Sequence, residues 1–153
     1  MPKNAHVKTA RPYGGMPLSE RRQTRRKKLM EAGYDLFGTI GVNRTKIEQV
    51  CSHAGVGSRS LYDEFGSLET LFLFVYDDVI DRAYDAIEVA LLNGESSNAS
   101  EALEAGISTY FHQMLEDPRS GRIVSIESAR LDSFLGSHRN DTLNRFAELT
   151  TRL

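Results

Sequence analysis

The stretch CSHAGVGSRSLYDEF, residues 51–65, constrains the fold of this chain more than any other segment. Apolar residues at helical spacing lie on both sides of a break of only a few residues, so two helices must meet there. Gly55 lets the backbone turn sharply, Val56 can fill the core beneath the turn, and Cys51 lets the helices approach closely. The spacing therefore predicts a helix-turn-helix. The residues expected to point outward are Ser58, Arg59 and Ser60.

Apolar residues recur at three- and four-residue spacing along most of the chain, which predicts an all-α fold. In the front half we expect a helix from an N-cap at Ser19 to Ile40, a second from a capping box at Thr45 and Glu48 to Gly55, and a third from Gly57 or Ser58 to Phe65. A long helix is expected from an N-cap at Ser67 to about Leu92. After the loop 93–100, further helices are expected up to Asp117, from Ile123 to about Leu135, and from about Asp141 onward. Gly41 is expected to end the first helix. The last helix meets no stop signal, so we expect the fold to be incomplete at the C-terminus.

Three segments are expected along the chain. Residues 1–18 contain three prolines and a Gly-Gly pair without a sustained period, which predicts a flexible basic arm. Residues 19–66 form the helix-turn-helix domain, and residues 67–153 form a second helical domain. The helix that opens the second domain is expected to span roughly 37 Å, long enough to act as a stiff lever between the two.

The net charge of −2 hides a strong asymmetry between the two halves of the chain. Residues 1–65 carry twelve Lys or Arg against six Asp or Glu, whereas residues 66–153 carry seven against fifteen. A basic front half suggests that this half alone meets a polyanion such as nucleic acid. Charge also permits a plainer interpretation, in which two solvated surfaces have opposite sign.

Several classes of protein are disfavoured by the composition. A single cysteine, Cys51, excludes an internal disulfide framework and fits the cytoplasm. The N-terminus has no apolar signal stretch, and no run of residues is apolar enough for a membrane span. The four histidines have no metal-ligand spacing, and no nucleophile–base pair is recognisable. We therefore expect no enzyme, no metal site and no cofactor.

Six short segments carry a family resemblance. LMEAGYDLF, Gly41, TKIEQVC, AGV, LYDEF and GSLETLF, between Leu29 and Phe72, resemble the TetR family of bacterial transcriptional regulators, and their spacing agrees without an insertion. The resemblance implies a homodimer that binds a palindromic operator in double-stranded DNA. It also implies a C-terminal ligand and dimerisation domain, in which a small-molecule effector changes DNA affinity, most often by relieving repression.

The resemblance also implies which residues meet DNA. Phosphate contacts are expected from Arg25, Arg26, Thr45, Lys46 and Tyr62, and base readout from Ser58, Arg59 and Ser60. Tyr62 could instead be a core ring with a solvated hydroxyl, and Arg11 of the arm either reaches a minor groove or is part of a disordered tail. Asp63, Glu64 and Leu68 depart from the family pattern. They support an alternative, a helical protein-interaction module that has lost DNA binding.

Candidate effector-binding residues lie in the rear half. We chose them by the helix face on which they are expected to lie and by their side-chain chemistry. They are Tyr110, Phe111, His112, Met114, Glu127 and Arg130. Glu127 lies on an apolar helix face, where a carboxylate is usually paired. The plainer interpretation of Glu127 is therefore an ion pair with Arg130 one turn further along.

Overall fold

The computed structural model describes residues 17–93 and 98–151. The described elements are α1 (Leu18–Thr39), the 3-10 helix η1 (Val42–Arg44), α2 (Ile47–His53), α3 (Ser60–Phe65), α4 (Leu68–Asn93), α5 (Ala99–Glu116), α6 (Pro118–Arg122), the π-helical segment η2 (Ile123–Glu127), α7 (Ser128–Arg130) and α8 (Asp132–Thr151). No strand occurs within these two ranges, so the predicted all-α fold is confirmed. The expected basic arm lies outside the described residues except for its last two.

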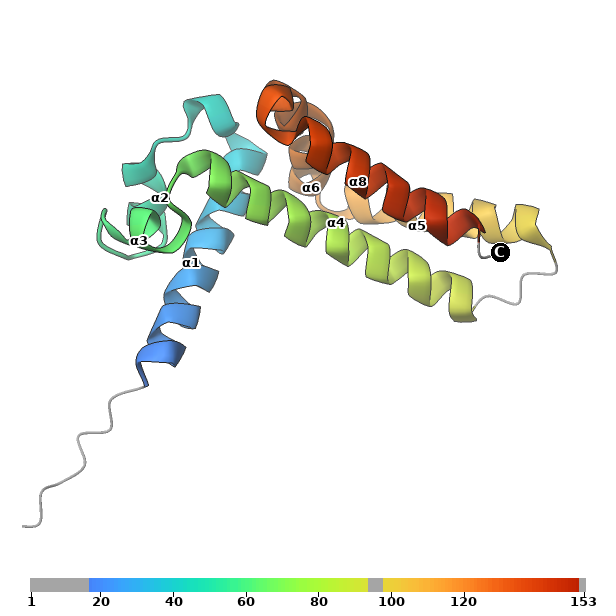
Figure 1. Cartoon of the computed structure of the whole chain (residues 1–153), viewed down its shortest axis with the longest axis horizontal. Coiled ribbons are helices and arrows are strands. Elements are labelled where there is room, and N and C mark those ends of the chain that lie inside the picture. Colours follow the sequence, from blue (N-terminus) through green and yellow to red (C-terminus); the bar gives the residue numbers. More distant parts are fainter. Residues whose placement is uncertain (1–16, 94–97, 152–153) are drawn as a thin grey trace, which may run out of the picture.

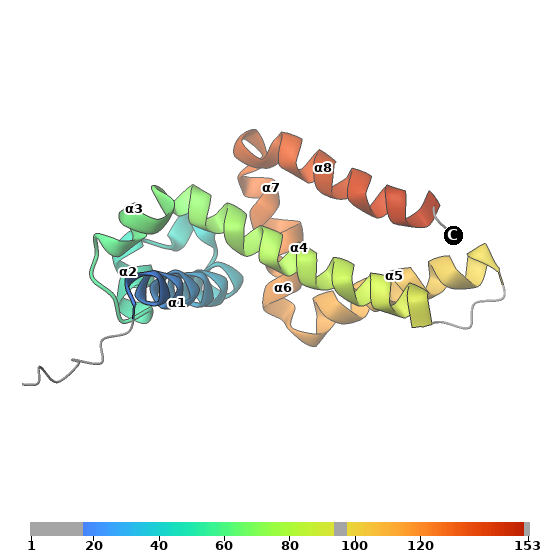
Figure 2. The ribbon, with the colours of Figure 1, turned by 60° about the horizontal axis from the view of Figure 1, so that its bottom comes forward.

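The helices form two groups joined by α4 (Figure 1). α1, α2 and α3 cluster at one end, and α4 leaves them to run along the rest of the molecule for 26 residues, about 39 Å. α5 packs along α4 and makes the most extensive helix pair of the fold. Figure 2 shows how α6, η2 and α7 then cross α4 and bring the chain to α8 on its other side. The last helix thereby lies along α4 and reaches α5, where the rings of Phe146 and Tyr110 have their centroids 5.9 Å apart.

The core is continuous from the first group of helices into the second. Phe37 of α1 meets Phe72 of α4 edge to face, with ring centroids 5.3 Å apart, and both are fully buried. The same cluster of buried residues reaches Ile123 of η2 and Leu135 of α8. Since a close-packed core transmits displacements, a shift of η2 must be felt by α1 and α4.

Some predicted helix boundaries in the front half are confirmed and two are wrong. Gly41 ends α1 with a positive φ of 91°, and the Ser67 hydroxyl accepts the Thr70 N–H at 3.1 Å at the start of α4. Ser19 is not an N-cap, because α1 already begins at Leu18 after Pro17. Thr45 does not cap α2 either. Its hydroxyl donates back to the Gly41 carbonyl at 2.9 Å, since the η1 turn brings that carbonyl next to it.

In the rear half the predicted stop before Asp117-Pro118 is confirmed, because α5 ends at Glu116, but two predicted starts are wrong. The next helix was expected at Ile123, whereas the Asp117 carboxylate accepts the Arg119 N–H at 3.0 Å and α6 begins at Pro118. The helix predicted for residues 123–135 breaks at Leu131, where ψ is 25°, and α8 begins at Asp132 instead of Asp141. No glycine or proline marks this break, so the local pattern contains no signal for it. No described helix is both long and apolar enough to cross a membrane.

Candidate nucleic-acid interface and ligand pocket

The predicted helix-turn-helix is present at the end of the molecule formed by α1, α2 and α3. Gly55 has a φ of 65°, and the Val56 N–H donates to the Cys51 carbonyl at 2.9 Å to close the turn. Val50, Cys51 and Leu61 are buried between the two helices. Because these apolar faces are used inward, the turn and the outer face of α3 remain available for a partner.

The side chains predicted to read bases lie on that outer face. Ser58 and Arg59 are exposed just before α3, and Ser60 is its first residue. The Arg59 side chain is 89% exposed, and its one described contact is an ion pair of 3.5 Å with the exposed Asp63. Tyr62, one turn into the helix, is also exposed, which disfavours a core role for its ring. Lys46 is exposed just before α2.

Glu64, which departs from the family pattern, is buried inside the domain and does not lie on its outer face. Its carboxylate is 1% exposed and accepts hydrogen bonds from Arg22 Nε at 3.0 Å and from Arg25 Nη2 at 2.5 Å. Burial alone would raise the pKa of Glu64, but the hydrogen bonds and charges of the two guanidinium groups outweigh it and hold the pKa below its usual value. The charge of Glu64 is therefore neutralised inside the domain.

Arg26 completes this arginine cluster, which we define as Arg22, Arg25 and Arg26. Its guanidinium lies between the rings of Phe65 and Phe74, 4.4 and 4.3 Å from their centroids, and donates to the Glu64 carbonyl at 3.2 Å. The cluster thus fastens α1 to the C-terminal end of α3. The phosphate contacts predicted for Arg25 and Arg26 stay a prediction. Exposed basic residues next to them on α1 are Arg21, Lys27 and Lys28.

The lowered pKa of Glu64 predicts how acid affects the fold. The folded state holds the proton of Glu64 less readily than the unfolded chain, so the stabilisation is complete above about pH 4.5, the usual value. It is lost as the pH falls through the lowered value. The wild-type chain is therefore expected to be more stable than Glu64→Gln at neutral pH, with a difference that shrinks in acid. Thermal unfolding followed by circular dichroism between about pH 7 and pH 3 measures this.

The matched control for this experiment is Asp63→Asn, which removes the neighbouring carboxylate. Asp63 is exposed, and its ion pair with Arg59 is too solvated to contribute much. We expect this variant to follow the wild-type pH profile. Parallel curves for wild type and Glu64→Gln would contradict the assigned role of Glu64.

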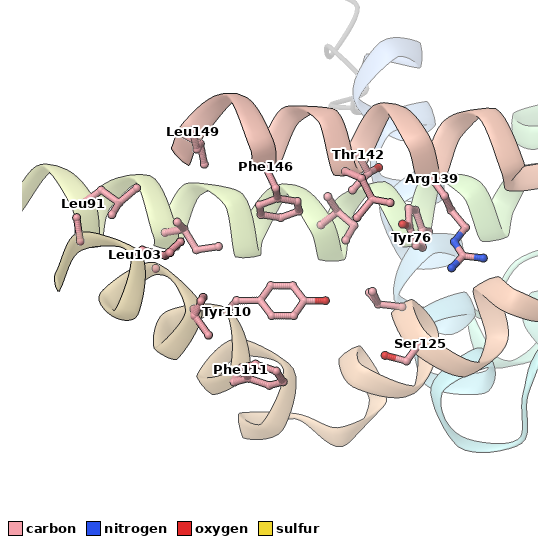
Figure 3. A pocket seen from close by; sticks show the side chains of 17 residues that line it. Tyr76, Leu91, Leu103, Tyr110, Phe111, Ser125, Arg139, Thr142, Phe146 and Leu149 are labelled. Atoms are coloured by element: carbon pink, nitrogen blue, oxygen red, sulfur yellow. The ribbon is translucent and has the colours of Figure 1, made fainter. Parts of the chain in front are cut away.

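A pocket of about 620 Å³ lies in the second group of helices. α4, α5 and α8 supply mostly apolar walls, among them Ile80, Leu103 and Phe146, and η2 supplies Val124 and Ser125 at one end. Figure 3 shows the side chains of Tyr76, Ser125, Arg139 and Thr142 gathered at that end, and Leu91, Leu103 and Leu149 at the other. The pocket is therefore polar at one end and apolar along its length, as binding sites for small molecules often are.

Two of the six predicted ligand residues line this pocket. Tyr110 and Phe111 do so, and Figure 3 shows the Tyr110 ring lying across the middle of the pocket. His112 lies outside it and faces solvent, 3.9 Å from Glu116. Met114 also lies outside it, buried in a separate small cluster with Val79 and Ala83. Glu127 and Arg130 also fall outside the pocket.

Arg139 is the important residue that sequence reasoning missed. Among the described residues that line the pocket, it carries the only formal charge. Arg139, Thr142 and Phe146 are spaced by three and four residues, as on one helix face, and this spacing is a signal that could have found them. It was hidden because the last helix was expected to begin at Asp141, two residues after Arg139.

Glu127 links the pocket end of η2 to the helix-turn-helix. Its carboxylate is fully buried and accepts the backbone N–H of Val42 in η1 at 3.0 Å and Arg122 Nε at 3.0 Å. Arg122 in turn donates to the Thr39 carbonyl at 2.7 Å. The pairing predicted with Arg130 is present but longer, at 3.7 Å. Gly41 makes the approach possible, because a Cβ there would lie 2.9 Å from the Glu127 carboxylate.

A second link joins α6 to α1. Arg119 binds the carboxylates of Asp117 and Asp35, and its guanidinium lies over the Tyr34 ring, 4.8 Å from the centroid. The hydrogen bond from Arg119 holds the pKa of Asp117 far below its usual range. The Tyr34 and Ser120 hydroxyls are hydrogen-bonded at 2.8 Å. With the Glu127 contacts, these bonds tie both ends of the α6–η2 segment to α1 and η1.

Residues 17–93 and 98–151 contain no cluster of metal-ligating side chains. Cys51 is buried, and its thiol donates to the Ser58 carbonyl at 3.6 Å, so it packs the turn beneath the exposed face. The described residues therefore offer two candidate sites, the outer face of the helix-turn-helix and the pocket.

Comparison with known proteins agrees with this arrangement. Residues 29–75 match the sequence model of the bacterial regulatory proteins, tetR family. A curated protein, the HTH-type transcriptional activator FasR of Mycolicibacterium smegmatis, is 26% identical over 116 residues, which make up 74% of this chain and 52% of that protein. The chain thus spans about half the length of the curated relative it matches.

Solved structures with the same fold include two bacterial regulators. The fatty acid degradation regulator FadR from Bacillus halodurans superposes with a TM-score of 0.69 at 18% identity, covering 82% of this chain and 63% of that one. A TetR-like transcriptional regulator from Rhodococcus sp. RHA1 also gives 0.69, at 20% identity, covering 90% of this chain and 71% of that one. At such identities the likeness shows the fold: an N-terminal helix-turn-helix followed by a helical domain.

Proposed function

Because the chain belongs to the TetR family of bacterial regulatory proteins, we propose that it binds operator DNA through α3 and responds to a small molecule in the pocket. The observation that carries the proposal is the outer face of the helix-turn-helix, where Ser58, Arg59 and Tyr62 are exposed while the apolar faces of α2 and α3 are buried. The pocket lies among α4, α5 and α8, whereas Figure 1 shows α2 and α3 clustered at one end of α4, so DNA and ligand do not compete for the same surface.

The proposed contacts divide into positioning and reading groups. Lys46 and Tyr62 bind phosphates, and Ser58, Arg59 and Ser60 reach base edges in the major groove. Arg25 and Arg26 act through α3, which they fasten to α1, more than through direct contact with DNA. Thr45 is 6% exposed, and its hydroxyl donates to the Gly41 carbonyl. It therefore stabilises the backbone next to Lys46 from inside the domain.

A homodimer is part of the proposal because one copy presents one recognition helix. Two copies related by a two-fold axis would read the half-sites of a palindrome, whose centres lie about one DNA turn, roughly 34–36 Å, apart. Since the target is genomic DNA in a bacterial cell, we place the protein in the cytoplasm. Dimer formation on DNA is measured as two chains bound per operator duplex.

The contacts of η2 suggest how the ligand would change DNA affinity. Val124 and Ser125 line the pocket, and Glu127, two residues further, holds the backbone N–H of Val42 next to α2. A ligand that displaces η2 therefore moves η1 and α2, and with them the distance between paired recognition helices. We propose release from DNA as the result, as expected of a repressor. FasR, the curated relative, is named an activator, so the transcription of a reporter gene decides the sign.

A gel-shift titration with DNA that flanks the gene of this protein tests the proposal. Binding is expected to be specific and to weaken about a thousandfold or more between roughly 50 and 200 mM salt, because phosphate contacts release counterions. Absence of binding, or binding that ignores salt, would favour the protein-interaction module. Glu64 no longer supports that alternative, because its charge is neutralised inside the domain. Asp63 and Leu68 still support it.

A further inference from the structure

We propose that the pocket takes an anionic amphiphile, a long apolar chain with one carboxylate, whose head binds Arg139 and whose tail lies along α4. The inference rests on the proposed function, since it names the ligand class of the same pocket. The polar end of the pocket supports an anionic head group, and the apolar remainder supports a chain-like tail. The two parts of the inference therefore rest on separate observations.

The polar end of the pocket favours a carboxylate. Arg139 brings the only charge among the described residues of the lining, and Tyr76, Ser125 and Thr142 bring hydroxyl groups to the same end (Figure 3). The Tyr110 hydroxyl points toward this end too. Burial raises the pKa of both Tyr76 and Tyr110, so their hydroxyls stay protonated and able to donate at neutral pH. A positive charge with several donors suits an anion, and it disfavours a cation.

Arg139 is able to exchange its present partner for a ligand. Its guanidinium donates to the Asp132 carboxylate at 2.8 Å, and the Asp132 side chain is 70% exposed. An ion pair this open to solvent is weak. A carboxylate arriving from the sheltered side of Arg139 would meet hydroxyl donors that Asp132 does not reach, so it would compete well with Asp132.

The rest of the pocket favours a long and uncharged tail. Lining residues on α4 run from Tyr76 to Leu91, a distance of about 22 Å at the rise of an α-helix. This length is far greater than a compact metabolite needs. Leu103, Ile107 and Leu143 line the same space yet are about half exposed, which leaves apolar surface in contact with water. An alkyl chain laid along α4 would cover that surface.

Calorimetric titration of the full chain with three ligands of equal chain length tests the head group. These are hexadecanoic acid, hexadecan-1-ol and hexadecylamine, each kept below the concentration at which it aggregates. The acid is expected to bind about tenfold or more tighter than the alcohol, because a charged hydrogen bond is lost without the carboxylate. Octanoic acid is expected to bind roughly a hundredfold weaker than hexadecanoic acid, since burying each methylene contributes to affinity.

Two variants separate the role of Arg139 from a general effect on the pocket. Arg139→Gln is expected to abolish the preference for the acid while leaving the affinity for the alcohol within about twofold. Asp132→Asn is the matched control, because it removes the competing carboxylate and should leave acid binding equal or tighter. Equal losses of acid and alcohol in Arg139→Gln would overturn the proposal. Tighter binding of alcohol or amine by the wild type, or of octanoic acid, would do so without relying on any variant.

A gel shift in the presence of hexadecanoic acid keeps this inference distinct from the proposed function. If the protein binds DNA specifically and no acid binds in calorimetry, the ligand class is wrong and the regulator stands. If the acid binds through Arg139 while DNA binding is absent, the ligand class stands and the proposed function is wrong.

Discussion

Glu127→Ala is expected to lower the free energy of unfolding by about 3 kcal/mol, although Glu127 lines neither the pocket nor the outer face of the helix-turn-helix. The substitution removes a fully buried carboxylate and leaves the Val42 N–H and the Arg122 Nε–H without their acceptor. An unsatisfied buried donor and an unpaired, largely buried charge are both costly. Urea unfolding followed by circular dichroism measures the change.

Glu88→Ala provides the control for this measurement. Glu88 is an exposed glutamate on α4, and removing it is expected to change stability by no more than about 0.5 kcal/mol. Equal stabilities of Glu127→Ala and Glu88→Ala would show that the contact with η1 contributes nothing.

Glu127→Gln addresses coupling without the full loss of stability. The amide oxygen can still accept the Val42 N–H, but it cannot neutralise Arg122, so η2 is held less firmly. We expect the pocket to keep its ligand affinity while the effect of ligand on operator affinity, typically about 5- to 150-fold between coupled sites, falls several-fold. An unchanged ratio of operator affinities with and without ligand would place the transmission elsewhere, for example in the Arg119 contacts.

Arg59→Ala is expected to weaken operator binding by about 1–3 kcal/mol while random-sequence DNA loses far less. The guanidinium is 89% exposed and has only a solvated pair with Asp63, so the fold should keep its stability within about 0.5 kcal/mol. Fluorescence anisotropy on operator and random duplexes at one salt concentration measures both affinities. The ratio between them reports base reading, which a general electrostatic effect would not change.

Arg145→Ala is the matched control for Arg59→Ala. Arg145 is an exposed arginine of α8 with an exposed partner, Asp81, and it lies on the helix group remote from the DNA-facing end. Its loss removes the same formal charge and should leave both affinities nearly unchanged. Equal losses of operator and random-duplex affinity in Arg59→Ala would reassign Arg59 to phosphate contact.

The helix-turn-helix could be predicted because its geometry is encoded within fifteen residues. Apolar residues at helical spacing decide which faces of α2 and α3 are buried, and Gly55 supplies the positive φ that the turn requires. Because those faces are buried, the side chains of Ser58 and Arg59 must point outward. Helical spacing and composition likewise singled out Tyr110 and Phe111, and both line the pocket.

Contacts between distant segments could not be predicted in this way. Glu64 stood out in the sequence only as a departure from the family pattern, but the arginines that neutralise it lie 39 and 42 residues earlier in the chain. Glu127 was predicted as a pocket residue or the partner of Arg130, but its carboxylate accepts a backbone N–H 85 residues away and the Nε–H of Arg122. Sequence spacing carries information about neighbours on one helix and none about which helix covers a given face.

Local periodicity and turn chemistry act over a few residues. They determine the helix type, the buried faces of the first three helices and the exposure of Arg59. The arginine cluster, the Glu127 link and the polar end of the pocket at Arg139 follow from how α1, η2 and α8 are packed against α4. Packing brings charges from remote positions into low-dielectric surroundings, where pairing becomes obligatory. Local sequence thus determines the outer face of the helix-turn-helix, whereas the contacts that link it to the pocket-lining helices arise only when the helices pack together.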